Sequence, residues 1–179
     1  MKPTIEQLAA KLCNMRPESR DEAGLVTFPI GALYYAKEAK NNGFVDVGNN
    51  EDRWKGELAA TIEIGRKISR SEGLYDTKLT GIMHFNSALM RIDVGYERLL
   101  RYLTGYKGVS RKDLLSLALS SHGIEEATLR GWFTVRNEVN AMKHRNPEIF
   151  SRNRVTFDQM LSALFELVNL LEKHTKFCH

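Results

Sequence analysis

The sequence is poor in cysteine and lacks the long apolar runs that mark membrane and secreted proteins. Its two cysteines, Cys13 and Cys178, stand near opposite ends of the chain without metal-ligand spacing, which indicates reduced thiols. No run approaches the roughly 18 apolar residues of a membrane span. The first residues also lack the apolar segment of a signal peptide. These absences predict a cytoplasmic protein with no membrane association.

Several short catalytic motifs are missing as well. The sequence has no glycine-rich phosphate loop, no HExxH, no CxxC and no nucleophile-elbow serine. Asp93 and Glu97 are four residues apart on a predicted helix and form a pair of carboxylates, but the Glu-x-x-His pattern of di-iron bundles is absent. We therefore predict neither a metal site nor a cofactor.

The apolar residues that are present recur at helical spacing along most of the chain. Capping residues such as Thr4, Ser110 and Thr156 precede three of these patterns, and no segment shows the repeated alternation of a sheet. Pro29 is a suitable first residue for a helix, so the preceding LVTF segment is interpreted as extended. The predicted helices cover about 4–15, 29–41, 51–71, 78–103, 110–120, 124–146 and 156–174.

These patterns predict an all-α protein that forms one helical domain over residues 1–179. The helices between about 78 and 172 are expected to form a bundle core. Residues 1–73 are expected to be an N-terminal helical extension packed beside it.

The net charge is concentrated in residues 130–154. This segment holds six basic and two acidic side chains, an excess equal to the net charge of +4 of the whole chain. On a helix with 100° per residue, one arc of about 120° carries basic, amide and imidazole groups. Its members are Arg136, Asn137, Asn140, Lys143 and His144. The apolar residues Trp132, Val135, Val139 and Met142 fall on another face, suited to a core.

The helix order and the Arg136-Asn137…His144 group together resemble the HEPN superfamily. The resemblance covers about residues 78–172 and includes a long helix, a shorter one, the Arg-Asn helix, a basic loop and the closing helix TFDQMLSALFELVNLLEK. Seven residues separate Arg136 from His144, more than is usual in that family. A dimer, a broken helix or a lost activity would each account for this spacing.

The resemblance implies a helical bundle, often homodimeric, that acts as a metal-independent endoribonuclease of the defence or toxin type or as an inactive binding module. His144 would then transfer protons, Arg136 would hold the phosphate and Asn137 would orient either group. Asn140, Lys143, Arg145, Arg152 and Arg154 would contact the RNA backbone. The implied partners are RNA, a second copy of the chain and an antitoxin-like protein.

Three other interpretations remain open at the level of sequence. The basic face can be a solvated surface, with Arg136 paired to a buried acid such as Asp93 or Glu97. The protein can be a helical module that binds RNA, a nucleotide or a protein without chemistry. It can also be a structural dimer that uses the long helix 78–103 as its seam.

Overall fold

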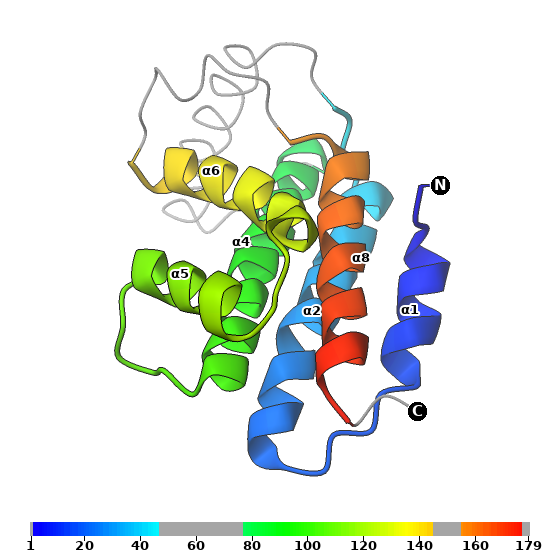
Figure 1. Ribbon diagram of the computed structural model, residues 1–179. Coiled ribbons are helices and arrows are strands. Elements are labelled where there is room, and N and C mark those ends of the chain that lie inside the picture. The colour runs from blue at the N-terminus through cyan, green and yellow to red at the C-terminus, as the bar shows by residue number, and fades with distance from the viewer. Residues whose placement is uncertain (1, 47–76, 145–154, 177–179) are drawn as a thin grey trace.

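The computed structural model describes residues 2–46, 77–144 and 155–176, and most of these residues are helical (Figure 1). The predicted all-α helical bundle is confirmed. The predicted helix over 51–71 lies outside the described residues. The elements are α1 (Ile5–Cys13), α2 (Arg20–Asn41), α4 (Thr77–Thr104), α5 (Arg111–Ser121), the 3-10 helix η1 (Glu126–Leu129), α6 (Arg130–His144) and α8 (Phe157–His174).

Helices α1, α2, α4 and α8 run along the bundle, and α5 and α6 lie across α4 (Figure 1). α2 runs in the opposite direction to the other three, and its contact with α4 is the most extensive in the described part of the chain. α1 packs against α2 and α8. The first two helices therefore pack directly on helices of the predicted C-terminal core.

Local capping explains where several helices begin. Thr4 and Thr156 each form a capping box with the glutamine three residues later, and the Ser110 side chain accepts a hydrogen bond from the backbone of Asp113. Each cap satisfies a backbone N–H group that has no partner inside its own helix. The three predicted starts are thus confirmed.

The predicted start of the second helix is wrong. α2 begins at Arg20, nine residues before Pro29, so the LVTF segment is helical rather than extended. Ser19 caps the helix, and the Glu22 carboxylate accepts a hydrogen bond from the Glu18 backbone. An internal proline costs about 3 kcal/mol, but Pro29 is buried and its ring lies against α4 near Gly95. Burial of this face of α2 favours the continuous helix.

Two glycines allow close helix crossings around α8. A Cβ atom on Gly95 of α4 would lie 2.8 Å from the Leu167 side chain, and one on Gly131 of α6 would lie 2.8 Å from the Ala163 Cα. Neither distance is compatible with ordinary packing. The apolar face of α8 is buried along its whole length, as its sequence pattern predicted. α8 therefore anchors both α4 and the helix that carries the predicted functional residues.

Candidate functional site

α6 has the two faces that its sequence predicted. Trp132, Val135 and Val139 are buried, which confirms the apolar face. On the other side Arg136 and Asn140 are half-buried, and Asn137 is exposed. The helix is continuous from Arg130 to His144, so a break between Arg136 and His144 does not account for their spacing.

Several of the predicted site residues cannot be placed. The side chains of Met142, Lys143 and His144, at the end of α6, lie outside the described part of the structure. Arg145, Arg152 and Arg154 fall in 145–154, also outside it. The described backbone does fix one quantity, because eight residues of continuous helix separate Arg136 from His144 by about 12 Å along the axis.

Arg136 rests on an aromatic ring instead of pairing with an acid. Its guanidinium lies 5.7 Å from the centre of the Trp132 ring, within reach of a cation–π contact. No carboxylate of the described residues forms an ion pair with it. The alternative that Arg136 pairs with Asp93 or Glu97 is wrong, because other arginines hold both of those acids.

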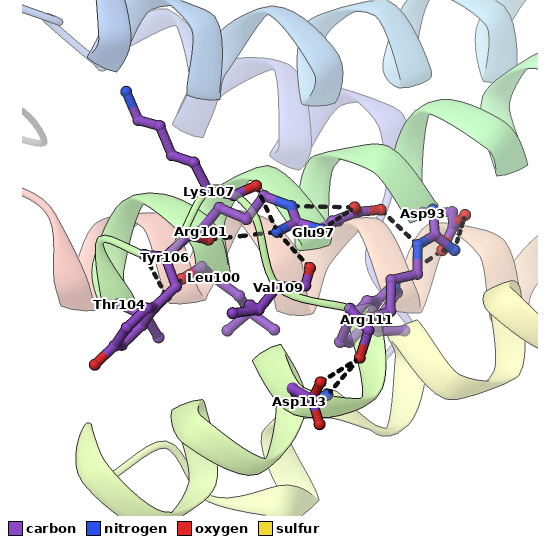
Figure 2. Close-up of polar contacts among 12 residues, drawn as sticks. Asp93, Glu97, Leu100, Arg101, Thr104, Tyr106, Lys107, Val109, Arg111 and Asp113 are labelled. Carbon is purple, nitrogen blue, oxygen red and sulfur yellow. Dashed lines mark hydrogen bonds and ion pairs between the residues drawn. The ribbon is translucent and has the colours of Figure 1, made fainter.

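Asp93 and Glu97 belong to a polar network inside the bundle (Figure 2). Arg111 of α5 reaches both acids, with its Nη1 3.0 Å from Asp93 Oδ2 and its Nε 2.5 Å from Glu97 Oε2. Arg101 binds Glu97 from the other side, at 2.8 Å. This network fixes α5 on α4.

The network also holds α6 in place. The Trp132 indole N–H donates to Asp93 Oδ1 at 2.9 Å, and Asp93 is completely buried. Arg111 contacts Asp93 Oδ2 as an ion pair, but that oxygen accepts no hydrogen bond of good geometry. Asp93 Oδ1 accepts the shorter hydrogen bond from Trp132 and a longer one, at 3.4 Å, from Arg111 Nη1, so both residues hold this acid. The Trp132 ring that supports Arg136 is therefore fixed to α4.

Both acids of α4 have arginine partners. Burial tends to raise the pKa of Glu97, but its hydrogen bonds and ion pairs with Arg101 and Arg111 outweigh burial and lower that pKa below the ordinary value. Among the described residues, no group of three or more His, Cys, Asp or Glu side chains is placed to hold a metal ion.

A second acid, Glu166 of α8, supports the start of α6. Its carboxylate accepts a hydrogen bond from the Gly131 backbone at 2.9 Å. Burial raises the pKa of Glu166, although the Gly131 N–H and the charge of Arg130 act in the opposite direction. Because the raised pKa makes the folded state bind the proton more tightly, ionisation of Glu166 destabilises the fold.

We expect this effect to appear as a pH dependence of stability. Stability should fall as pH rises from the ordinary carboxyl pKa through the raised one, and Glu166→Gln should remove that part of the change. At pH 7 the free energy of unfolding of the variant should match that of the wild type or be higher by at most about 1 kcal/mol. The effect is small because Glu166 is partly exposed and water screens its charge. Urea unfolding from pH 4 to 7 measures it. A difference between the two proteins that does not vary with pH would contradict the prediction.

Arg101 and Arg111 are not among the site residues predicted from the sequence. Arg111 follows the Ser110 cap and so looks like an ordinary charged residue of a first helical turn. Its partners are 14 and 18 residues earlier in the chain. Arg101 is four residues after Glu97, a spacing that does signal an ion pair within one helix.

Comparison with protein-family models, with curated proteins and with solved structures finds no match for this chain. Among the described helices, none is both long enough and apolar enough to cross a bilayer.

Proposed function

We propose that this protein is a metal-independent endoribonuclease of the HEPN type that binds RNA on the polar face of α6. The proposal rests on the state of Arg136. Arg101 and Arg111, which are also half-buried, have carboxylate partners, but Arg136 has none among the described residues. A guanidinium stacked on an indole keeps its N–H groups available to a phosphate.

In this mechanism each group has one role. Arg136 binds the scissile phosphate and stabilises the charge that develops on it. His144 takes the proton from the 2′-hydroxyl as its oxygen attacks phosphorus, and returns it to the 5′-oxygen as the phosphorus–5′-oxygen bond breaks, since an imidazole titrates near neutral pH. Asn137, exposed on the same face, orients the RNA, and Asn140, Lys143, Arg145, Arg152 and Arg154 extend the contact to neighbouring phosphates.

The separation of about 12 Å between Arg136 and His144 requires a second copy of the chain. In a symmetric dimer, Arg136 of one protomer and His144 of its partner would share one cleft. Light scattering at micromolar concentration should therefore report a dimer. A monomer would contradict the composite site and would also exclude the alternative of a structural dimer that uses the long helix 78–103 as its seam.

Cleavage of a structured RNA in EDTA tests the proposal. The wild type should yield 2′,3′-cyclic phosphate ends, and Arg136→Ala should lower the rate by about 100-fold, as for loss of one transition-state donor. Arg136→Lys keeps the charge but loses the planar fork, so it should also be slow. Arg130→Ala, at the exposed start of the same helix, is the matched control and should change the rate less than twofold.

A second function is favoured by the long Arg136–His144 spacing, namely RNA binding without cleavage. In that case RNA would remain intact, but the affinity of the protein for RNA would fall as the salt concentration rises. Arg136→Ala would lower the slope of log affinity against log salt concentration by about one. RNA cleavage at the wild-type rate in Arg136→Ala and His144→Ala would contradict the endoribonuclease proposal. Affinity that is insensitive to salt contradicts the binding module.

A further inference from the structure

A cavity of about 640 Å³ lies between the first turns of α2, the last turns of α4 and the loop that follows α4. Its volume is within the range of roughly 300–1,000 Å³ that is typical of small-molecule sites. In Figure 1 these elements meet at the opposite end of the bundle from the C-terminal end of α6. The cavity is thus separate from the polar face of α6.

The walls of the cavity carry an excess of unpaired positive charge. Four cationic side chains and two carboxylates line it. Glu97 is neutralised, because Arg101 and Arg111 both bind it. Among the described residues, no acid pairs with Arg20, Arg98 or Lys107. Asp21 alone opposes these three cations, so the cavity attracts anions.

The Arg98 guanidinium and the loop that carries Lys107 are held in place before any ligand arrives. The Arg101 guanidinium donates hydrogen bonds to the carbonyl oxygens of Tyr106, Lys107 and Val109, which fixes the loop at the rim. Figure 2 shows the Lys107 side chain extending away from Glu97. Arg98 lies 5.1 Å from the centre of the Phe28 ring. This order reduces the entropy that ligand binding must overcome.

The remaining lining is apolar or aromatic. Leu25 is buried, Val94 is half-buried, and Tyr102 has 43% of its surface exposed. A bare inorganic anion would leave this surface uncovered, whereas a ligand with a carbon body would bury it. The combination of three cations and an apolar wall therefore selects a molecule that has both a multiply charged group and an apolar part.

We propose that this cavity binds a small organic phosphate. The phosphate would lie among Arg20, Arg98 and Lys107, where a dianion is matched by several charge-assisted hydrogen bonds. The carbon part would lie against Leu25, Val94 and Tyr102. The proposal is independent of the proposed ribonuclease function, because none of these residues belongs to α6.

Calorimetric titration of the full-length protein with phenyl phosphate tests this site. Phenyl phosphate should bind more tightly than inorganic phosphate, and the neutral analogue phenol should not bind. Lys107→Gln and Arg20→Gln should each weaken phenyl phosphate about tenfold, the usual effect of losing one hydrogen bond to a charged group. Lys112→Gln removes an exposed charge of α5 outside the cavity and should leave the affinity unchanged.

Each contrary result identifies a different failure. Equal affinity for inorganic and phenyl phosphate would overturn the organic part of the proposal. An equal loss in Lys112→Gln and Lys107→Gln would mean attraction by the net charge of the protein and would overturn the site. No binding of either phosphate overturns it too. RNA cleavage by Lys107→Gln should match that of the wild type, so failure here is distinguishable from failure of the ribonuclease proposal.

Discussion

Replacement of Arg111 with methionine is expected to lower the free energy of unfolding by about 3–5 kcal/mol, the usual cost of removing one partner from a buried ion pair. Asp93 is fully buried and would keep its carboxylate without a cation. Methionine retains most of the apolar stem of arginine, so the loss measures charge and hydrogen bonding more than packing. Urea unfolding followed by far-ultraviolet circular dichroism measures the change in the free energy of unfolding.

Two further variants show whether the buried charge is the cause. Lys112→Met removes a neighbouring exposed charge from the same helix and should stay within about 0.5 kcal/mol of the wild type. Asp93→Asn in the Arg111→Met background removes the unpaired charge, and its Oδ1 can still accept the Trp132 bond. This second change should recover at least about 1 kcal/mol. Additive losses in the double variant would show that the two residues act separately.

The parts of the fold that depend on neighbouring residues could be predicted from the sequence. α1, α5 and α8 each begin directly after a residue whose side chain accepts a hydrogen bond from the backbone N–H three residues later. The sequence signal for each helix start therefore lies within a single turn. α2 shows how such signals can compete. Ser19 and Glu22 have capping-box spacing, but Pro29 gave a second plausible start, and only burial against α4 favours the longer helix.

The polar contacts of the candidate site depend on long-range packing and could not be predicted. Periodicity identified the face of α6 that holds Trp132, but it could not reveal that the indole meets Asp93, which is 39 residues away. Periodicity also could not show whether a carboxylate would form an ion pair with Arg136. The cavity likewise combines residues of α2, α4 and the loop after α4, whose charges are unremarkable in their own segments.

Trp132 contributes both to stability and to the proposed function, because its ring is buried in the core and also contacts Arg136. It is fully buried, stacks on Tyr96 with ring centres 5.9 Å apart and donates to Asp93. Trp132→Ala should therefore destabilise the protein by about 3–5 kcal/mol, from lost burial and the cavity that remains. Chemical unfolding monitored by circular dichroism measures the loss.

Trp132→Phe separates the packing of the ring from its hydrogen bond. Phenylalanine keeps a buried aromatic surface beside Tyr96 but cannot donate to Asp93, so we expect a smaller loss of about 1–3 kcal/mol. If packing alone mattered, Trp132→Phe would resemble the wild type; if the bond dominated, it would resemble Trp132→Ala. A change below about 1 kcal/mol in Trp132→Ala would contradict the assigned core position. Because phenylalanine still offers a ring face to Arg136, RNA cleavage by Trp132→Phe should exceed that of Arg136→Ala.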